Sequence, residues 1–480
     1  MTLNPPSAAF LDDLRALLGP SGWRDGADAA PYLVEPRGRW RGHAALVARP
    51  ADTGAVAEVV RRCAAARVGV IPYGGGTGLV GGQVMERGPA PIVLSLERMN
   101  AIRRIDPAEG AMIVEAGAIL AQVRAAAEGA DRLFPLALAS EGSARIGGLL
   151  ATNAGGVNVL RYGNARDLTL GVEAVLADGS VLHGLKTLRK DNTGYDLRHL
   201  LIGSEGTLGV ITAAALKLFP RPRETATAFC ATPSPQAACD LLPRLRDRLG
   251  ETISAFELLS AQGMAFLAEH LPEAPRPPVQ SAWFVLVEVG AGRESGVAAA
   301  LEAGLAEGFE AGLVTDAALA QSQAQAQAFW RIREDTPEAN RRVGAVASHD
   351  VSLPLAALPR FIETAAAAVA ALDPGLRINC FGHIGDGNLH YNIFPPQGVA
   401  RDACDALRPQ VVRAVHDLVD QYGGSVSAEH GIGRFKTGDL ARYGDPAKLA
   451  AMAAIKAALD PLGILNPGAM IARSGRDAAA

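Results

Sequence analysis

The chain has 480 residues, of which 49% are hydrophobic, so at about 100–200 residues per domain we expect two or three domains with large cores. Its net charge of −4 and pI near 6.2 lack the basic footprint of a nucleic-acid-binding protein. No run reaches roughly 18 uncharged apolar residues, and the N-terminus has no secretory signal pattern, so we expect no transmembrane segment. The five cysteines form no CxxC pair and no even framework, which predicts a reduced chain in the cytoplasm.

The first 220 residues are predicted to mix helices with short strands. Hydrophobic spacing predicts helices over residues 9–19, 54–67 and 119–127, and strands over 68–71, 92–96, 112–116 and 209–219. Residues 172–176 and 181–183 flank Asp178-Gly179, a pair that favours the type I′ turn of a β-hairpin. Two prolines in Pro220–Arg223 then mark a domain boundary.

Beyond this boundary the chain is rich in alanine. It predicts helices over residues 235–248, 295–308, 317–333, 355–372 and 402–421, with strands over 283–289 and 378–381. This alternation indicates an α+β domain whose antiparallel sheet is covered on one face. From Gly423 the sequence turns polar and glycine-rich again, with one further helix over 446–460.

A glycine-rich loop follows the strand at 68–71. Residues 72–82 contain a literal GxGxxG at Gly76, Gly78 and Gly81, but the glycines and prolines over 82–91 prevent the helix that a dinucleotide fingerprint requires. Successive amide groups without Cβ atoms can instead form a nest for a phosphate or diphosphate. Purely structural turns are the alternative. Further glycine and amide runs at 135–148, 151–156, 161–164, 191–196 and 202–209 can line a slot for a heteroaromatic ring.

Histidines mark the second candidate site. His383 and His390 are seven residues apart and separated by the turn sequence Gly385–Asn388, so they can face each other across a hairpin. Glu429 precedes another histidine, His430, and the glycines at 431 and 433 let the backbone approach a ligand closely. Two histidines and a glutamate are typical of a catalytic metal site with open positions, for which zinc is favoured over iron or manganese. The alternative is a set of ordinary core histidines beside a surface glutamate.

Together these motifs resemble the vanillyl-alcohol-oxidase superfamily, in its branch of FAD-linked D-2-hydroxyacid dehydrogenases. That branch includes D-lactate dehydrogenases, D-2-hydroxyglutarate dehydrogenases and the glycolate oxidase flavin subunit. The resemblance covers residues from about 40 to 220 and from about 375 to 470. It implies an α+β fold with a PCMH-type FAD-binding domain over 1–221, a substrate or cap domain over 222–422, and a segment over 423–480 that returns to the first domain. The loop has no histidine, which implies non-covalent FAD.

The resemblance also implies roles for single residues. Positions His383, His390 and Glu429 would hold the metal, with His430 as the catalytic base, and Arg333, Thr336, Ser348 and Asn392 would contact substrate. The expected cofactor contacts are Pro72, Gly74, Gly75, Gly76, Thr77, Gly78, Leu79, Gly81, Gly82, Pro135, Ser140, Gly142, Ser143, Gly147, Asn153, Gly156, Tyr162, Glu205, Gly206, Ile211 and Asn466.

The reaction implied is oxidation of a D-2-hydroxyacid to the 2-oxoacid, with D-2-hydroxyglutarate as the first choice of substrate. Relatives acting on it typically carry Thr or Ser at the position of Pro337 and Lys at that of Ser348, so D-lactate or an apolar hydroxyacid stays open, as does a distal carboxylate contact from His349 or Lys436. A non-catalytic electron-relay subunit and a flavin-dependent alkyl-glycerone-phosphate synthase are rival readings. The expected electron acceptor is a protein, such as an electron-transfer flavoprotein, or a quinone. A homodimer is left open.

Overall fold

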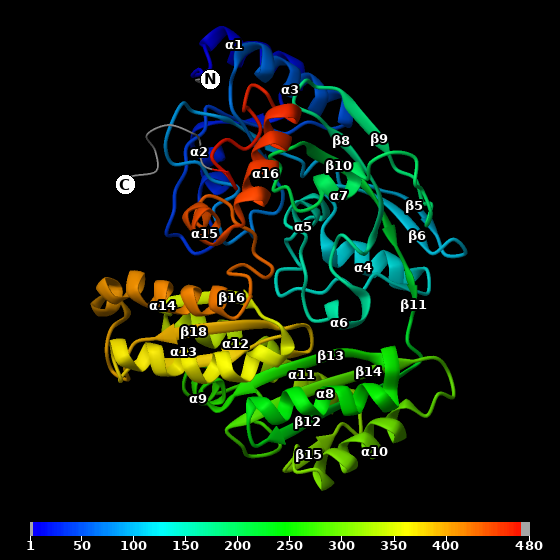
Figure 1. The fold of residues 1–480 in the computed structure, drawn as a ribbon. Helices are drawn as coiled ribbons and strands as arrows, with labels where there is room; N and C mark the ends of the chain where they lie inside the picture. The colour runs from blue at the N-terminus through cyan, green and yellow to red at the C-terminus, as the bar shows by residue number, and fades with distance from the viewer. Residues whose placement is uncertain (1–2, 472–480) are drawn as a thin grey trace. The chain divides into compact units, whose positions relative to one another are not determined.

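The computed structural model describes residues 3–471, which form two compact units (Figure 1). The first unit takes the chain up to Gly155, then Asn164–Arg221, and resumes at Glu429. The second takes Gly156–Gly163 and Pro222–Ala428. Nothing in the sequence predicts that Gly156–Gly163 groups with the second unit, because this run reads as part of the glycine-rich cofactor stretch.

Two larger sheets and one two-stranded sheet, which pairs β11 (Phe219–Pro220) with β7 (Arg132–Leu133), build the first unit. One of the larger sheets has the order β1 (Trp23–Arg24), β2 (Leu46–Ala48), β4 (Ile92–Ser95), β3 (Val70–Tyr73), with β2, β4 and β3 parallel. The other is antiparallel, with the order β5 (Ile102–Asp106), β6 (Ala111–Glu115), β10 (Val210–Lys217), β8 (Thr169–Val175), β9 (Val181–Gly184). The predicted hairpin is confirmed, since β8 and β9 pair with Val175 opposite Val181, but its turn is not the predicted type I′, because only Gly179 of the Asp178-Gly179 pair has a positive φ, of 80°. The remaining elements are α1 (Ala8–Leu18), α2 (Gly26–Ala29), α3 (Thr53–Ala66), α4 (Leu120–Gly129), α5 (Ile146–Ala151), α7 (Leu197–Leu201), α15 (Thr437–Tyr443) and α16 (Pro446–Leu459).

Helix α3 illustrates how the sequence sets these elements. Its N-cap Asp52 accepts a hydrogen bond from the Ala55 amide, and the helix ends where Arg67 takes a left-handed conformation with φ 55°. The apolar stripe predicted from spacing is buried, with Val56, Val59, Val60 and Cys63 all at 0% exposure in the core that α3 shares with the parallel strands.

The second unit contains two antiparallel sheets. The larger has the order β13 (Ile253–Ser260), β14 (Trp283–Ala291), β12 (Glu224–Thr232), β15 (Asp316–Leu319), and the smaller has the order β16 (Ala347–Ser352), β18 (Asn388–Phe394), β17 (Arg377–Phe381). The helices are α6 (Val159–Tyr162), α8 (Pro235–Leu249), α9 (Ala261–His270), α10 (Val297–Glu310), α11 (Gln323–Glu334), α12 (Thr336–Val343), α13 (Leu358–Leu372) and α14 (Arg408–Gln421). Figure 1 shows α8 and α10 against the larger sheet.

Three expectations for this unit are corrected. The larger sheet is covered on both faces rather than one at β13, because every residue of that strand is buried, on either side of the pleat. Residues 316–319 form edge strand β15 and not the start of a helix, since α11 begins only after its N-cap Ser322. The helix expected from residue 402 begins at Arg408, preceded by 3₁₀ turns over Arg401–Leu407.

One helical stretch, Leu355–Leu372, is a weak candidate membrane span by length and composition alone, although it is not an uncharged run of the kind that the sequence is expected to lack. It includes Arg360 and Glu363, and α13 packs against α14 with Phe361 and Ala365 fully buried.

Candidate active site

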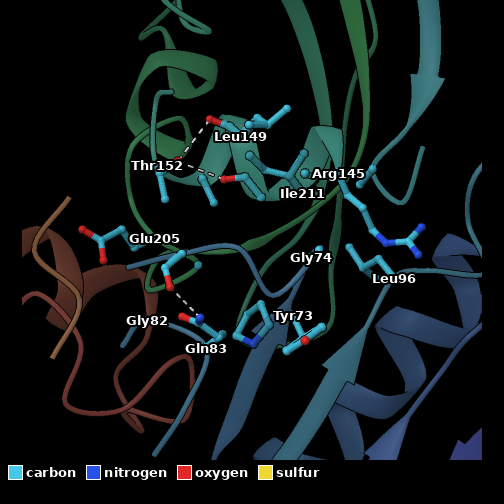
Figure 2. A pocket seen from close by; sticks show the side chains of 18 of the residues that line it. Tyr73, Gly74, Gly82, Gln83, Leu96, Arg145, Leu149, Thr152, Glu205 and Ile211 are labelled. Atoms are coloured by element: carbon cyan, nitrogen blue, oxygen red, sulfur yellow. Dashed lines mark hydrogen bonds between the residues drawn. The ribbon is translucent and has the colours of Figure 1, made fainter. Parts of the chain in front are cut away.

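A deep pocket opens in the first unit where the glycine-rich loop leaves β3. The space within it and at its mouth is about 980 Å³ and is lined by the loop, by residues of Ile146–Ala151 and by residues of β10. Figure 2 shows Leu149 and Ile211 on one side of this pocket and Tyr73, Gly74 and Gln83 on the other. Apolar side chains thus face a loop made almost entirely of backbone.

The loop presents unbonded amide groups. The Gln83 side chain donates to the carbonyl oxygens of Gly78 at 2.7 Å and Gly76 at 3.3 Å, which holds those carbonyls on its own side of the loop (Figure 2). Within residues 3–471, no protein acceptor is recorded for the amide groups of residues 74–78. A run of unpaired N–H groups at the wall of a pocket fits the phosphates of a dinucleotide, so these residues fit FAD.

Several glycines of this loop are required by packing against protein. A Cβ atom on Gly75 would lie 2.1 Å from the Ser143 carbonyl oxygen, and one on Gly81, where φ is +72°, would lie 2.4 Å from the Phe435 ring. The loop therefore sits directly on its neighbours, and glycine is needed as much for that approach as for any ligand.

The pocket includes many of the residues expected to contact the cofactor, but not all. Of the expected set, Pro72, Gly74, Gly75, Gly76, Thr77, Gly78, Gly82, Gly147, Glu205, Gly206, Ile211 and Asn466 line it, and so does His430. The lining does not include Leu79, Gly81, Pro135, Ser140, Gly142, Ser143, Asn153, Gly156 or Tyr162. Lining residues that the sequence does not single out include Tyr73, Gln83, Arg145, Leu149, Thr152 and Leu201.

The C-terminal segment is fastened to the pocket wall by Glu205. This carboxylate, 7% exposed, accepts hydrogen bonds of 2.7 Å from the Ile432 and Gly433 amides. Burial raises the pKa of Glu205, an effect that the two amides oppose. Gly431 and Gly433 are expected to let the backbone approach a ligand, but they allow close contact with other parts of the protein instead. A Cβ atom on Gly431 would lie 2.6 Å from Glu205 Oε1, and one on Gly433 would lie 2.0 Å from the Val80 carbonyl oxygen. Glu205 thus fixes the backbone just beyond His430.

Arg434 completes this attachment. Its guanidinium donates to the carbonyl oxygens of Gly81 and Gly82, both at 2.9 Å, and to Asn466 Oδ1 at 2.7 Å. Asn466 in turn donates to the Glu205 carbonyl oxygen at 2.7 Å. One charged side chain therefore ties the glycine loop to two separate stretches of the C-terminal segment.

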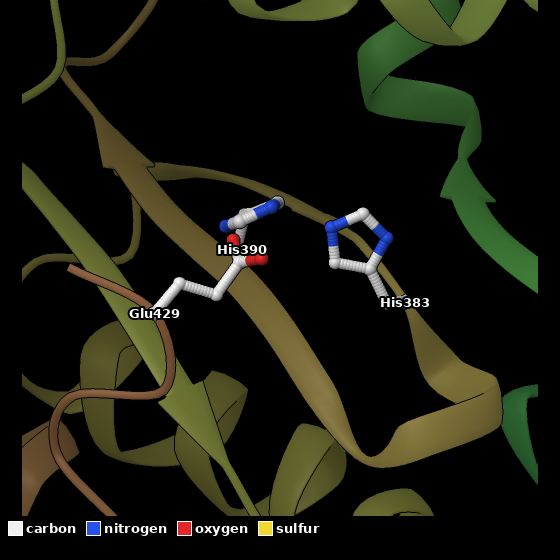
Figure 3. Close-up of side chains that lie close together, drawn as sticks. All are labelled: His383, His390 and Glu429. Carbon is white, nitrogen blue, oxygen red and sulfur yellow. The ribbon is translucent and has the colours of Figure 1, made fainter. Parts of the chain in front are cut away.

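The second unit carries the histidine cluster. The expected hairpin is present: β17 and β18 pair with Phe381 opposite His390, and His383 lies two residues beyond the end of β17. The two imidazole rings are 5.4 Å apart between centroids. The Ala428 amide donates to the Asp350 carbonyl oxygen, and Glu429 is the next residue. One ligand atom from each of His383, His390 and Glu429 lies within 4.8 Å of the others (Figure 3). This donor set of two nitrogens and one oxygen fits a divalent transition metal.

A buried carboxylate lies near Nδ1 of each of the two histidines. His383 Nδ1 lies 2.7 Å from Glu257 Oε1, and His390 Nδ1 lies 3.8 Å from Asp350 Oδ1. Burial would raise the pKa of Glu257, but His383 and Arg333 lower it to about 2, so the group is a carboxylate. Sequence reasoning did not identify Glu257 or Asp350.

The expected substrate residues do not all converge. Ser348 and Asn392 lie opposite each other on β16 and β18 and share a face with His390, two residues from Asn392. Arg333 is 6% exposed and donates through Nε to Glu257 Oε2 at 2.7 Å. Thr336, in contrast, is 1% exposed and, at the start of α12, donates to the Ile332 carbonyl oxygen in the last turn of α11, so it is a structural residue.

His349 is also turned away from Ser348. It is 3% exposed, and its Nδ1 lies 3.1 Å from Nε2 of the equally buried His416 on α14. Adjacent strand residues point to opposite faces, so His349 does not provide the contact considered for a distal carboxylate.

Two residues expected to contact the cofactor, Gly156 and Tyr162, belong to the second unit. There the neighbouring Leu160 packs against Gly385, in the hairpin that carries His383 and His390.

Comparison with known proteins agrees with this architecture. The family model described as the C-terminal domain of FAD-linked oxidases matches residues 221–470, and the model described as an FAD-binding domain matches residues 44–184. The chain therefore belongs to the FAD-linked oxidases. More particularly, it belongs with the D-2-hydroxyglutarate dehydrogenases, and it is an FAD-dependent dehydrogenase.

Three relatives illustrate this kinship. The mitochondrial D-2-hydroxyglutarate dehydrogenase of Arabidopsis thaliana is 38% identical over 433 residues, covering 89% of this chain and 75% of that one. The mitochondrial enzyme of Rattus norvegicus is 38% identical, covering 89% and 78%. The D-2-hydroxyglutarate dehydrogenase of Xanthomonas citri pv. viticola is 36% identical, covering 92% of both chains.

Solved structures share the fold at low identity. A p-cresol methylhydroxylase has a TM-score of 0.77 at 18% identity, covering 98% of this chain and 99% of its own. An alkyldihydroxyacetonephosphate synthase has a TM-score of 0.72, also at 18% identity, covering 97% and 86%. The expected vanillyl-alcohol-oxidase fold is confirmed by these neighbours.

The expected cytoplasmic location is wrong by the same comparison, because the Arabidopsis and rat relatives are named as mitochondrial proteins. The prediction rested on cysteine usage. All five thiols are free, namely Cys63, Cys230, Cys239, Cys380 and Cys404. Free thiols indicate a reducing environment, but they do not distinguish one reducing compartment from another.

Proposed function

We propose that this chain oxidises a D-2-hydroxyacid, D-2-hydroxyglutarate first of all, to the 2-oxoacid, using non-covalent FAD and a divalent metal ion, foremost zinc. The names of the relatives support the substrate. The donor set of His383, His390 and Glu429 supports the metal. We propose further that the reduced flavin passes its electrons to a protein or quinone acceptor, because the GxGxxG run belongs to the flavin loop and not to a nicotinamide fold.

One observation carries the proposal, and it concerns consecutive residues. Glu429 contributes to the histidine cluster, while His430 lines the pocket of the glycine-rich loop. Consecutive Cα atoms are about 3.8 Å apart, so the chain itself keeps the candidate metal ligand and the pocket residue together. A hydroxyacid dehydrogenase needs this proximity, since a group that polarises the substrate hydroxyl must act beside the hydride acceptor.

Several side chains would act on the hydroxyacid, each with a different role. A divalent metal held by the cluster would supply a Lewis acid for the hydroxyl and carboxylate oxygens. His430 accepts the hydroxyl proton at a ring nitrogen, as general base. Arg333 donates N–H groups to a carboxylate, and Asn392 donates its amide on the same face as His390.

The pocket provides for the cofactor in a complementary way. FAD would supply the acceptor for the hydride released from the substrate Cα. The amides of Gly74–Gly78 donate to the diphosphate, and Leu149, Leu201 and Ile211 provide apolar contacts that exclude water from the ring system.

A second candidate substrate, D-lactate or another D-2-hydroxyacid without a second carboxylate, is favoured by a specific observation. Ser348 brings no cation to the face that holds Asn392, and the Thr336 hydroxyl is bonded to the Ile332 carbonyl oxygen of the preceding helix. The distal carboxylate of hydroxyglutarate would then lack a charged partner at these positions.

Anaerobic mixing of the FAD-loaded protein with paired D- and L-hydroxyacids tests the function, with flavin absorbance near 450 nm as the signal. We expect bleaching by D-enantiomers only, loss of bleaching after chelation, and recovery with zinc. His430→Asn should retain FAD and lose bleaching, while the matched surface variant His199→Asn should bleach normally. If no hydroxyacid bleaches the zinc-restored protein, the proposal is wrong and the electron-relay reading gains support.

A further inference from the structure

A buried carboxylate in the second unit joins two parts of the candidate site. Glu257 lies on β13 with 1% of its surface exposed. Its Oε1 is 2.7 Å from His383 Nδ1, and its Oε2 accepts from Arg333 Nε, also at 2.7 Å. One carboxylate oxygen therefore bonds the candidate metal ligand His383, and the other bonds the candidate substrate residue Arg333.

The bond to His383 determines the form of that ring. An ionised carboxylate only accepts hydrogen bonds, so the nitrogen 2.7 Å away must carry the proton. With Nδ1 protonated, a neutral imidazole has its lone pair on Nε2, which is then the atom available to a metal. Glu257 therefore selects the tautomer in which His383 can be a ligand.

The bond to Arg333 determines the direction of its guanidinium. Glu257 occupies Nε, and the guanidinium carbon lies 4.9 Å from the centre of the Phe381 ring. Among the described residues no hydrogen bond is recorded for Nη1 or Nη2, and neither atom is among the buried unpaired ones. The two outer nitrogens thus remain for an anion, in the fork geometry that matches a carboxylate.

We propose that Glu257 is a positioning residue that fixes His383 and Arg333 against each other, and so sets where a metal-bound hydroxyacid can place its carboxylate. This inference rests on the proposed function. It assigns Glu257 no contact with substrate, and its effect passes through the two residues it holds.

The isosteric change Glu257→Gln isolates this role. Glutamine has one acceptor oxygen, whereas two donors face this side chain. If that oxygen accepts from Arg333, the amide N–H₂ faces His383 and forces the proton to Nε2, which removes the metal-binding lone pair. The double variant Glu257→Gln/Arg333→Met frees the oxygen to accept from His383, so it should regain the ligand tautomer. A purely structural role for Glu257 predicts no such recovery.

Zinc affinity of the FAD-loaded protein, measured by competition with a chromophoric chelator, is the direct test. We expect Glu257→Gln to weaken zinc binding by about 10–100-fold, the usual effect of losing a residue that orients a ligand. The double variant and Arg333→Met should bind zinc within about 3-fold of the wild type, by the same principle, since His383 keeps an acceptor. Arg333→Met should raise KM instead.

The matched control is Glu288→Gln on adjacent β14, a carboxylate that accepts from Trp330 Nε1 at 2.7 Å and should leave zinc affinity unchanged. Equal zinc affinity in the wild type and Glu257→Gln would refute the positioning role. Absence of zinc binding by the wild type would instead refute the proposed function. If Glu257→Gln fails to fold by near-ultraviolet circular dichroism, Arg333→Met is compared with Arg333→Met/Glu257→Leu. A 10–100-fold loss supports the proposal, and equal affinity overturns it.

Discussion

Replacing Gly75 with alanine should release FAD without unfolding the protein. A Cβ atom there would lie 2.1 Å from the Ser143 carbonyl oxygen and 3.1 Å from Ala144 Cα, against 3.4 Å for an ordinary contact. The loop must therefore move by about 1.3 Å, the difference between 3.4 and 2.1 Å, and Ser143 and Ala144 block one direction. Movement into the pocket is the open direction, so the cost falls on the cofactor.

Overpacking of this kind costs about 1–3 kcal/mol, which corresponds to roughly 5–150-fold weaker FAD binding. Fluorescence quenching during titration of the apoprotein with FAD measures the change, and thermal unfolding of the apoprotein measures fold stability. The control is Gly129→Ala at the end of α4, where a new Cβ meets nothing within 4 Å. FAD affinity within about 2-fold of the wild type in Gly75→Ala would contradict the close approach of loop and Ser143.

Three further predictions concern the attachment, the specificity and the pH response. Arg434→Ala should lower the free energy of unfolding by about 2–3 kcal/mol by chemical denaturation, because four acceptors lose a charged donor, whereas Arg87→Ala at an exposed position should not. Ser348→Lys should raise the ratio of kcat/KM for D-2-hydroxyglutarate over D-lactate by about 10-fold, and an unchanged ratio would place the distal carboxylate elsewhere. Burial would raise the pKa of Glu257, yet His383 and Arg333 lower it from 4.5 to about 2, so its ion pairing stabilises the fold above pH 4.5 and is lost as the pH falls toward 2. The unfolding free energy of the wild type should therefore fall more steeply than that of Glu257→Gln over this range.

Much of the fold follows from local patterns. Apolar spacing places α3 within a residue at each end, and Asp178-Gly179 predicts the β8–β9 hairpin. Strand β15 is missed because its sequence, Asp316–Leu319, has helix-favouring alanines, and only pairing with β12 makes it extended. Tertiary pairing, which no local pattern contains, decides such short segments.

The candidate site, like the fold, follows only in part from local sequence patterns. Residue type and turn chemistry predict the hairpin that carries His383 and His390, because glycine and asparagine mark the turn. They do not predict what Gly431 and Gly433 approach, since a glycine signals close contact without naming the partner. Here the partners are Glu205 and Val80.

The sequence does mark Glu257, although a search for apolar periodicity overlooks it. It is the single charge in Ile253–Ser260, a strand of otherwise apolar or small residues that reads as core. A carboxylate enters a core only when cations or strong donors meet it there, because the cost of desolvation is several kcal/mol. A lone acidic residue in an apolar strand therefore predicts a buried partner and a reason to retain the charge. The strand itself cannot identify that partner, because Arg333 and His383 come from segments 76 and 126 residues further along the chain.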